Sequence, residues 1–598
     1  MYRQVLDPVA DSLGWSSLFA ALPLVTLFVL LGVLRMRAWM AALISLAVAI
    51  AVAVLVYPMP VDQALLAASE GAVFGFFPIL WIVLNAIWIY NMTVETGHFD
   101  VLRRSFASVS DDQRIQAVII AFCFGALLEA LAGFGTPVAI TSVMLIALGF
   151  RPIKAAAVAL VANTAPVAFG ALATPIVTLA TVTGLPEDDL GAMVGRQTPL
   201  LALFVPLVLV FIVDRRHGVR AVWPAAAVCG VTFAVAQFVT SNYISVALTD
   251  IVAALLSAGA VVLFLRAWQP AGTYVEDEPD LPVTAGRRGG RGVLGRGTAQ
   301  AARLGRDGAE SATVSGSGPG LAADDDTSTG AVGRHRAATG PYAGDGRPAT
   351  PDAPAEVARA YAPYLIIIAV FVIAQLPGIK SAIADTTKVF TWPGLDLTNS
   401  AGKPLALQKF TFNWLSAGGT LLLIAGLLTM PVLRLSPGRA FAAYVRTYRQ
   451  LLTAIVTVMA VLALAYVMNA SGQTATLGNW MAAAGGLFAV LSPILGWLGV
   501  AVTGSDTSSN SLFGALQVTA ANKAGLDPLL MAASNSSGGV LGKMVSPQNL
   551  AIAAAAVGLA GREGDLFRRV LAWSLLLLAV MVGLVVLQST AVLSWMVP

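Results

Sequence analysis

The chain has 598 residues, of which 57% are hydrophobic and only 11% are charged, whereas an average soluble domain has about 25% charged residues. Because so much apolar surface cannot be hidden in a water-soluble fold, we expect a membrane protein. A net charge of +4, with most basic residues between apolar spans, argues against a nucleic-acid-binding protein. Cys123 and Cys229 stand in separate apolar stretches and predict neither a disulfide framework nor a CxxC metal site.

Apolar runs of membrane-spanning length follow an N-terminal segment, MYRQVLDPVADSLGWSS, that lacks the features of a cleaved signal peptide. A helix needs about 20 apolar residues to cross the hydrocarbon layer. The runs of this kind are 16–34, 38–57, 71–90, 197–213, 221–240, 244–265, 360–376, 413–433, 451–469 and 567–590. Two further regions, 115–183 and 487–560, are apolar but interrupted. The sequence therefore predicts an all-α polytopic membrane protein with about 12 transmembrane helices, two re-entrant hairpins and broken helices.

The distribution of lysine and arginine predicts the orientation, because these residues gather on the cytoplasmic side of a membrane. Arginines follow the first and third spans, whereas the connector 58–70 between the second and third spans has no lysine or arginine. The odd-numbered ends are therefore expected to be cytoplasmic, with both termini outside. Segment 377–412 goes against this pattern, because its four lysines would lie outside.

Residues 266–358 differ in composition from the rest of the chain, being rich in Gly, Pro, Ser, Arg and Asp with hardly any apolar periodicity. Such a segment cannot bury enough apolar surface to order itself, so it predicts a disordered cytoplasmic linker. The linker separates a first membrane half, 1–265, from a second, 359–598. A regulatory or lipid-binding role for its arginines is the alternative to a solvated spacer.

The two interrupted regions resemble each other and predict an internal repeat. Matching residues lie 371 positions apart at Gly133/Gly504 and Thr136/Thr507, and 372 apart at Asn163/Asn535, Gly170/Gly542 and Pro175/Pro547. Each region predicts a helical hairpin followed by a broken helix. The hairpins are expected at 115–149, with the tip at 133–137, and at 487–521, with the tip at 503–510, and the broken helices at 153–183 and 527–560. The first hairpin enters from the cytoplasm and the second from outside, so the repeats are inverted.

Inverted repeats with interrupted helices are typical of secondary transporters whose site lies near the middle of the bilayer. Unpaired backbone N–H and C=O groups cost several kcal/mol in hydrocarbon, so broken helices persist only where protein, water or a ligand satisfies them. The N-termini of half-helices present the positive end of a dipole. The breaks therefore predict an anionic substrate.

Four strings in these regions closely resemble those of the bacterial L-lactate permease family. They are GFGTPVAI (133–140), NTAPVAFGALATP (163–175), TGSDTSSNSLFGALQ (503–517) and SNSSGGVLGKMVSPQNLAIA (534–553). The resemblance covers most of the chain outside 266–358. It implies a multi-pass bacterial plasma-membrane symporter that moves lactate, and in relatives glycolate, together with a proton. It also implies paired re-entrant hairpins, in agreement with the repeats.

A proton-coupled carrier needs a group that changes charge inside the membrane, and all three histidines fall in predicted cytoplasmic segments. Glu129 and Asp506 are therefore the candidate proton-coupling residues, since burial favours the protonated form of a carboxylate. The alternative for each is a fixed ion pair, most obviously with Lys543. Lys543 either binds the substrate carboxylate or neutralises Asp506, and the sequence leaves both open. The coupling proton is expected in place of any cofactor or metal.

Polar residues of the breaks and tips are the candidate substrate contacts, through hydroxyl, amide and backbone N–H donors. They are Gly133, Gly135, Thr136, Asn163, Thr164, Thr507, Ser508, Ser509, Asn535, Ser536 and Ser537, with Lys543 as the cation. Each residue alone is also explained as a residue whose polar groups form hydrogen bonds within a helix break, but the set together indicates a binding site. The expected partners are a small anion and the lipid bilayer, and homo-oligomerisation is left open.

Other functions compete with proton-coupled uptake of L-lactate by alternating access. D-lactate, glycolate or another short carboxylate is the first alternative, and a passive anion channel is the second. A membrane-embedded enzyme is disfavoured because the spans carry no HExxH, no GxSxG and no His/Cys metal cluster. SGGVLGKM (537–544) lacks the first Gly and the final Ser/Thr of a phosphate-binding loop, which argues against ATP-driven transport.

Overall fold

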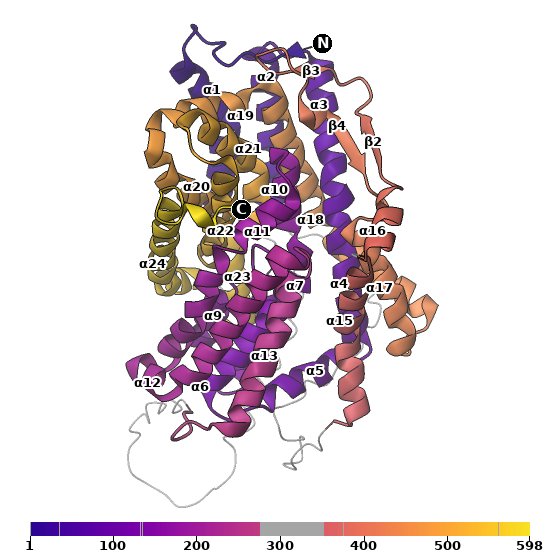
Figure 1. Cartoon of the computed structure of the whole chain (residues 1–598), viewed down its shortest axis with the longest axis vertical. Coiled ribbons are helices and arrows are strands. Elements are labelled where there is room, and N and C mark those ends of the chain that lie inside the picture. Colours follow the sequence, from indigo (N-terminus) through magenta and orange to yellow (C-terminus); the bar gives the residue numbers. More distant parts are fainter. Residues whose placement is uncertain are drawn as a thin grey trace, which may run out of the picture.

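The computed structural model of the chain describes residues 2–34, 36–131, 133, 135–275, 352–374, 376–559 and 561–598. These residues form helices almost throughout, packed side by side, with short strands near the N-terminus in the upper part of the view (Figure 1). The predicted linker 266–358 lies outside the described residues from 276 to 351. The mostly helical class expected from composition is observed.

Helices of the first half follow the predicted apolar runs. They are α1 (Leu13–Phe28), α2 (Ala38–Leu55), α3 (Val61–Phe74), α4 (Trp81–Glu95), α5 (His98–Ala107), α6 (Gln113–Gln116), α7 (Gly125–Leu131), α8 (Thr136–Ala147), α9 (Pro152–Ala162), α10 (Gly170–Thr183), α11 (Glu187–Val194), α12 (Thr198–Tyr243) and α13 (Thr249–Ala267). Wider turns η1 (Val29–Val33), η2 (Gly75–Leu80) and η3 (Ala117–Phe124) extend α1, α3 and α6.

The second half contains helices and three of the four short strands. Its helices are α15 (Pro354–Ala374), α16 (Pro377–Ala384), α17 (Gly418–Val432), α18 (Pro437–Ser471), α19 (Gln473–Met481), α20 (Phe488–Thr503), α21 (Asp506–Ala524), α22 (Pro528–Gly542), α23 (Pro547–Ala556) and α24 (Glu563–Gln588), with the short turns η4 (Ala406–Gln408), η5 (Ala482–Leu487), η6 (Lys543–Val545) and η7 (Ser594–Met596). The strands are β1 (Tyr2–Arg3), β2 (Lys388–Thr391), β3 (Leu397–Thr398) and β4 (Lys409–Phe412). These strands were not part of the all-α prediction.

Ten helical stretches of the described residues are long and apolar enough to cross a membrane. Shorter apolar helices of 10–17 residues include α8, α9 and α10, which all belong to the first interrupted region. The predicted spans 197–213 and 221–240 are joined in the single element α12, which bends where Asp214 and Arg215 leave helical geometry. The exact number of crossings, expected to be about 12, stays a prediction.

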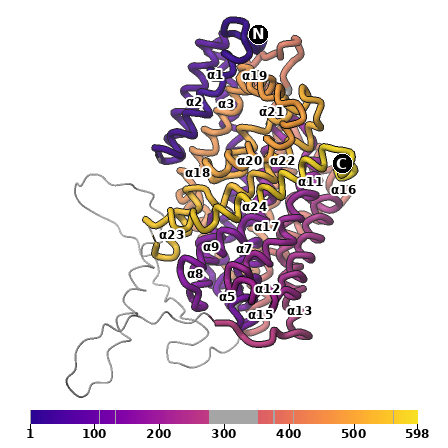
Figure 2. Tube along the Cα trace, turned by 90° about the vertical axis from the view of Figure 1, so that its left-hand side faces the viewer, coloured from indigo at the N-terminus to yellow at the C-terminus, as the bar shows by residue number. Residues whose placement is uncertain are grey.

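The two halves of the sequence share one core. Helix α18 of the second half packs along α2 and α3, and α1 packs against α19. In the turned view, α1–α3 accordingly lie beside α18, α19 and α21, whereas α8, α12 and α13 lie lower down (Figure 2). Helices α2 and α3 therefore pack mainly against an element that lies far away in sequence.

The interrupted regions have the same order of elements and exchange equivalent contacts. Each has two helical limbs separated by a short break, α7/α8 and α20/α21, and then two helical segments, α9/α10 and α22/α23. The prediction that Asn535, Ser536 and Ser537 lie in a helix break was wrong, because α22 continues through them to Gly542 and the interruption follows at η6. Helix α8 packs against α23, and in the same way α21 packs against α10. The second limb of each hairpin thus contacts the last helical segment of the other repeat, as an inverted repeat predicts. Re-entry of the hairpins into the membrane stays a prediction.

Ion pairs join chain segments that the arginine pattern places on the cytoplasmic side. Arg104, after the third predicted span, pairs with Asp352, which precedes α15 (2.8 Å). Glu95 at the end of α4 pairs with Arg439 and Arg446 at the start of α18. Segments with the same predicted orientation are therefore neighbours in space.

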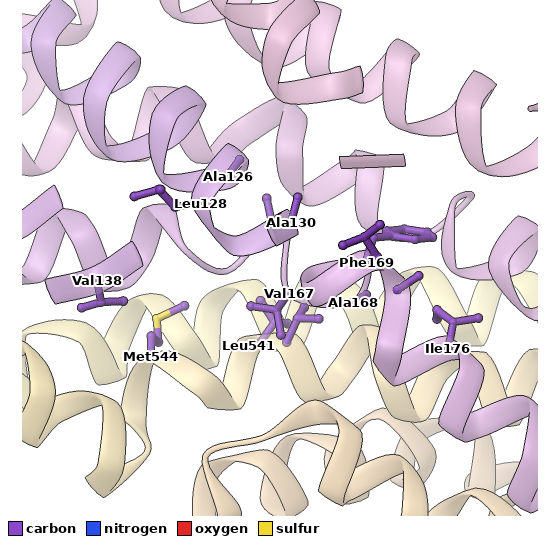
Figure 3. Packing of buried hydrophobic residues seen from close by; sticks show 14 of the residues in the cluster. Ala126, Leu128, Ala130, Val138, Val167, Ala168, Phe169, Ile176, Leu541 and Met544 are labelled. Carbon is purple, nitrogen blue, oxygen red and sulfur yellow. The ribbon is translucent and has the colours of Figure 1, made fainter. Parts of the chain in front are cut away.

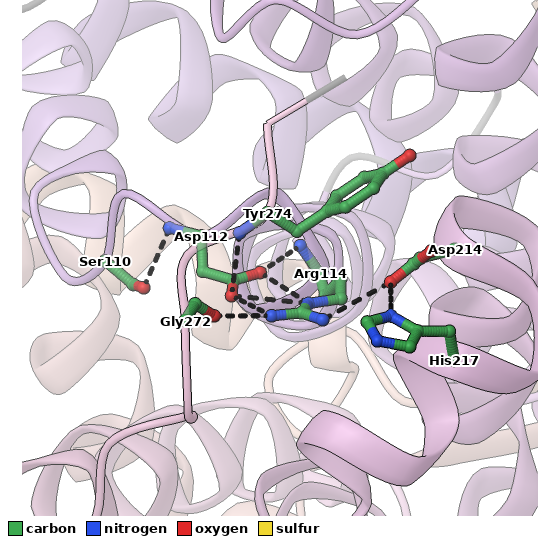
Figure 4. Close-up of polar contacts among 7 residues, drawn as sticks. All are labelled: Ser110, Asp112, Arg114, Asp214, His217, Gly272 and Tyr274. Atoms are coloured by element: carbon green, nitrogen blue, oxygen red, sulfur yellow. Dashed lines mark hydrogen bonds and ion pairs between the residues drawn. The ribbon is translucent and has the colours of Figure 1, made fainter. Parts of the chain in front are cut away.

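Arg114 lies at the centre of a buried polar cluster at the foot of the first hairpin (Figure 4). Its guanidinium donates to Asp112 (2.6 Å), to Asp214 (3.3 Å) and to the carbonyl oxygen of Gly272 (2.8 Å). The Tyr274 ring lies over it, with 5.6 Å between the guanidinium carbon and the ring centroid. The carboxylates offset the cost of burying the arginine, whose side chain is 3% exposed. The cluster ties the segment after α13 to the hairpin and to the bend in α12.

The N-terminus and the lysine-bearing segment 377–412 lie together. Strand β1 pairs in parallel with β3, with Tyr2 opposite Leu397. Both segments were predicted to lie outside the cell. Their pairing shows that the lysine-bearing segment and the N-terminus lie on the same side of the molecule, and the orientation relative to the membrane stays a prediction.

Candidate functional site

Glu129 and Lys543 form a buried ion pair between the two repeats. Glu129 lies on α7 of the first hairpin, and Lys543 opens η6, the turn between α22 and α23. Their side chains are 3% and 8% exposed, and the Lys543 ammonium donates to Oε1 of Glu129. Lys543 thus pairs with Glu129, while it also lies within electrostatic range of Asp506. Such a pair is stable only while both charges are present, because either alone would be a buried unpaired charge.

Glycines of the first repeat give Glu129 its space. A Cβ at Gly170 would lie 2.9 Å from Oε1 of Glu129, which is too close for any real side chain. Gly133, at the tip of the hairpin, has a φ of +51° and lies beside Glu129 and Ala171. Gly133 was a predicted contact and Gly170 a predicted repeat position, and both help to form the pocket around this carboxylate.

Asp506 opens α21 and is held by residues of the second repeat. Its Oδ2 accepts hydrogen bonds from the Ser536 hydroxyl (2.5 Å) and from Nδ2 of Asn510 (3.5 Å). Its other oxygen, Oδ1, is buried without a partner in the described part of the chain. Asp506 therefore lies 3% exposed on the face of α21 toward α22.

A chain of amides leads from Asp506 to the first repeat. Asn510 accepts a hydrogen bond from Asn535 (2.9 Å), and Asn535 accepts one from Gln517 (3.0 Å). Asn510 also donates to the carbonyl oxygen of Pro175 within α10 (3.1 Å). This contact satisfies the carbonyl of Pro175 inside α10 and links the hairpin of the second repeat to the broken helix of the first.

Asn163 and Ser537 have polar side-chain atoms without partners. Both amide atoms of Asn163 and the hydroxyl of Ser537 are buried, and none has a hydrogen-bond partner among the described residues. A buried polar group left in this way costs about 1–3 kcal/mol. Native proteins rarely leave such groups unsatisfied, so these two side chains are the best placed of the predicted set to receive a ligand.

Several other predicted contacts use their polar atoms within their own segments. The Thr164 hydroxyl donates to the Val161 carbonyl (2.6 Å), and the Ser509 hydroxyl donates to the Gly496 carbonyl (3.2 Å). The N–H of Ser508 is capped by Ser505 (3.3 Å). Hydrogen bonds of this kind close helix ends and breaks, so they give these residues a structural role.

The tips of both hairpins approach the same helix, α23. Gly135, whose φ is +80°, precedes Thr136 and lies against Ile552, where a Cβ would be 2.5 Å from that side chain. Gly504, whose φ is +76°, lies against Gln548 three residues before Thr507. Thr136 and Thr507 are half-buried at the start of α8 and in the first turn of α21. The structure thus brings the two predicted tips to one short helix.

Buried apolar side chains of the two repeats, some of them next in sequence to the ion-pair residues, lie close together (Figure 3). Ala130 on α7 and Phe169 in the first break are buried on the side of the first repeat. Leu541 and Met544, on either side of Gly542 and Lys543, are buried on the side of the second repeat, near Val167 and Val138 in the view. These residues remove water from the surroundings of the ion pair, which strengthens the electrostatic interactions there.

Sequence reasoning missed two polar residues near the site, Asp250 and Gln237. Asp250 is fully buried at the start of α13 and accepts a hydrogen bond from Gln237 on α12 (2.8 Å). Asp250 is the only charged residue in the predicted span 244–265. An isolated carboxylate in an apolar run is itself a sign of function, and this signal could have identified it.

The family model of the L-lactate permeases matches residues 16–288 and 347–593. Curated L-lactate permeases from Bacillus subtilis (strain 168) and Escherichia coli (strain K12) are each 38% identical to this chain, over 100% of both chains. The glycolate permease GlcA of Escherichia coli (strain K12) is also 38% identical, over 100% of this chain and 99% of its own length. Among solved structures, Neisseria gonorrhoeae MtrF, described as an antimetabolite efflux pump, has 12% identity and a TM-score of 0.42, over 87% of this chain and 82% of its own.

Proposed function

Because the chain belongs to the L-lactate permease family, we propose that it is a secondary active transporter that takes up L-lactate with a proton across the bacterial plasma membrane. The observation that carries this proposal is the 38% identity to L-lactate permeases over the full length of both chains. The equal identity to a glycolate permease supports glycolate as a further substrate. D-lactate is included because it differs from L-lactate only in the configuration of one carbon.

Coupling to a proton follows from the charge of the substrate. Lactate is an anion at neutral pH, and its movement into a cell that is negative inside costs about 2.3 kcal/mol per 100 mV. One proton carried with each lactate cancels this cost. The carrier therefore needs a site where the proton and the carboxylate are bound together.

The Glu129–Lys543 pair provides such a site. When Glu129 takes up a proton, its carboxyl group becomes neutral and the ion pair with Lys543 is lost. The freed ammonium group then pairs with the carboxylate of lactate, so the buried site keeps the same net charge. Without the proton, Glu129 competes with lactate for Lys543, which makes substrate binding depend on protonation.

Neighbouring groups complete the proposed binding site. The unpartnered Asn163 amide and Ser537 hydroxyl are suited to bind the 2-hydroxyl and carboxylate oxygens of lactate. Asp506 is buried and its Oδ1 has no partner in the described part of the chain, so it is the second candidate for the coupling proton. Alternating access is the proposed mechanism, with one hairpin gating each side, and the meeting of both tips at α23 supports it.

Uptake into proteoliposomes tests the proposal. A carrier accumulates labelled L-lactate above its equilibrium level when the outside is made acidic. Addition of lactate to the outside should in turn raise the external pH, because protons enter the vesicles with it. A passive channel would let lactate equilibrate without moving protons against their gradient. A panel of short carboxylates, with glycolate and D-lactate, identifies the substrate range. Absence of proton-driven accumulation in the wild-type protein would refute the proposed symport.

The Glu129→Gln variant tests the coupling step. We expect it to keep exchange of lactate for lactate but to lose accumulation driven by a pH gradient, because Lys543 stays free without a proton. Equal loss of exchange and accumulation would assign Glu129 to structure.

A further inference from the structure

Asp250 is a buried carboxyl group to which the mechanism above gives no role. It lies in the first turn of α13 and is fully buried. One carboxyl oxygen, Oδ1, accepts the hydrogen bond from Gln237, while Oδ2 has no partner in the described part of the chain. A carboxylate removed from water with a single neutral hydrogen-bond donor is costly, which makes Asp250 a candidate for a functional role.

The neighbours of Asp250 connect it to the ion pair. Helix α13, which carries Asp250, packs against α7, which carries Glu129. Gln237, which holds Asp250, also approaches the carbonyl oxygen of Ala165 in the first break (3.5 Å). That break ends at Gly170, which lies against Glu129. Asp250 and Glu129 are thus two buried acids on helices in contact, and within the described part of the chain only Glu129 forms an ion pair with a lysine.

A cavity reaches the same end of α13. It has a volume of about 400 Å³, and its wall includes Val246 and Ala247, which precede α13, and Leu172 and Val177 of α10. Asp250 lies three residues after Ala247. Leu172 directly follows Ala171, which lies beside Gly133 at the tip of the first hairpin. This end of α13 is the end predicted to face outward, since Arg266 marks its cytoplasmic end. The cavity therefore lies at the end of α13 that is predicted to face outward, close in sequence to Asp250.

We infer that Asp250 is a proton-relay residue that passes protons between this cavity and Glu129. In one transfer, the proton on Oδ2 of Asp250 moves to the Glu129 carboxylate. Asp250 then takes up a proton from the cavity, so that Glu129 gains one proton, the cavity loses one and no other bond changes. Gln237 is a positioning residue, because its amide fixes Oδ1 and leaves Oδ2 as the atom that carries the proton. This inference rests on the proposed lactate–proton symport.

Other titratable groups near this path are separate from the relay. Of the elements packed against α13, α7 carries Glu129, η3 carries Cys123, and α12 carries Cys229 and, at its bend, the charged residues from Asp214 to Arg220. The two thiols contact each other, and the hydroxyl of Ser257, further along α13 than Asp250, donates to Cys123. Glu187, Asp188 and Lys380 line the cavity and are the charged groups that a proton meets before Asp250.

The Asp250→Asn variant tests the relay, since asparagine keeps the size of the side chain and can still accept the hydrogen bond from Gln237. We expect the initial rate of lactate-dependent proton uptake into proteoliposomes to fall by about a hundredfold. Exchange of labelled lactate at equal pH on both sides should change by less than about twofold, because Glu129 and Lys543 remain. The Asp250→Glu variant should restore most of the proton uptake, with an altered pH profile.

Two further variants keep the test decisive. Glu70→Gln is the matched control, because Glu70 is also a buried acid with an unpartnered oxygen but lies on α3, which packs against α18. It should leave proton uptake unchanged. If Asp250→Asn does not fold, Gln237→Leu replaces it and should slow proton uptake more than exchange.

The outcomes separate the relay from the proposed function. Wild-type protein that moves no protons with lactate contradicts the symport itself. If the wild-type protein couples lactate to protons and Asp250→Asn couples them equally well, only the relay is overturned. A loss of proton uptake in Glu70→Gln equal to that in Asp250→Asn also overturns the relay. Parallel loss of exchange and proton uptake in both Asp250→Asn and Gln237→Leu would make Asp250 a structural residue and also overturns it.

Discussion

At the scale of single residues, the Glu129–Lys543 pair predicts a marked asymmetry between single and double variants. Lys543→Met leaves the Glu129 carboxylate buried without a cation, and breaking a buried pair in this way costs about 3–5 kcal/mol. Adding Glu129→Gln removes the stranded charge and should restore most of the lost stability. Thermal unfolding of the purified variants in detergent measures both effects.

An exposed pair provides the control for this prediction. Arg439 pairs with Glu95, and its side chain is 58% exposed. Arg439→Met should therefore change the stability by less than about 1 kcal/mol. A double variant as unstable as Lys543→Met alone would show that the lysine stabilises the fold through contacts other than its charge.

Asn163 and Asn535 occupy equivalent repeat positions but differ in their hydrogen bonds, and this difference predicts different phenotypes. Asn163 has no hydrogen-bond partner among the described residues, so Asn163→Ala should not lower the melting temperature and should raise the KM for lactate by about tenfold through the loss of one ligand hydrogen bond. Asn535 binds both Asn510 and Gln517, so Asn535→Ala should lower the stability by about 1–3 kcal/mol. Uptake kinetics and thermal unfolding of both variants distinguish the two roles. Unchanged uptake in Asn163→Ala would remove this amide from the substrate site.

At the scale of elements, close helix packing in the second repeat depends on glycine. Gly538 in α22 lies against α20, where an added Cβ would be 2.6 Å from the Cα of Pro493. Because the contact is with backbone, a side chain can be fitted only if the two helices separate. Gly538→Ala should therefore lower the stability by about 1–3 kcal/mol or prevent folding.

Gly583 in α24 is the matched control for this substitution. It is also a glycine inside a long helix, but an added Cβ would meet nothing within 4 Å. Gly583→Ala should be neutral or stabilising, because alanine favours helix over glycine by up to about 1 kcal/mol. Melting temperatures of the two variants, compared with the wild-type protein, check the prediction. Equal effects in both would show that the approach of α20 to α22 does not limit stability.

The helix breaks could be predicted from the sequence because their signals are local. Gly133, Gly504 and Asn163 interrupt apolar runs, and the chain breaks at or beside each of them. The partners across the breaks could not be predicted in the same way. That Glu129 rather than Asp506 forms the ion pair with Lys543 depends on how α7 and η6 are packed, and no spacing along the chain encodes that distance.

At the scale of the whole molecule, hydropathy predicted the apolar helices but not which of them are neighbours. The packing of α18 along α2 and α3 joins segments that lie hundreds of residues apart, and apolar surfaces of this kind are too similar in sequence to identify a partner. Segment 377–412 is a second example. Its lysines made its side uncertain, whereas the pairing of β1 with β3 places it beside the N-terminus.

The predicted orientation of the molecule can be tested with single cysteines, because both native cysteines are fully buried. Lys403 lies exposed in the segment beside the N-terminus, and Arg216 lies exposed at the bend of α12, next to the Arg114 cluster. The orientation that the arginines favour places these two residues on opposite sides of the membrane. A membrane-impermeant maleimide added to intact cells should therefore label Lys403→Cys and should label Arg216→Cys only after the cells are permeabilised. The reverse pattern would mean that the chain is inserted the other way round, so that the cavity beside Asp250 would open toward the cytoplasm and the proposed relay would deliver its protons to the inside.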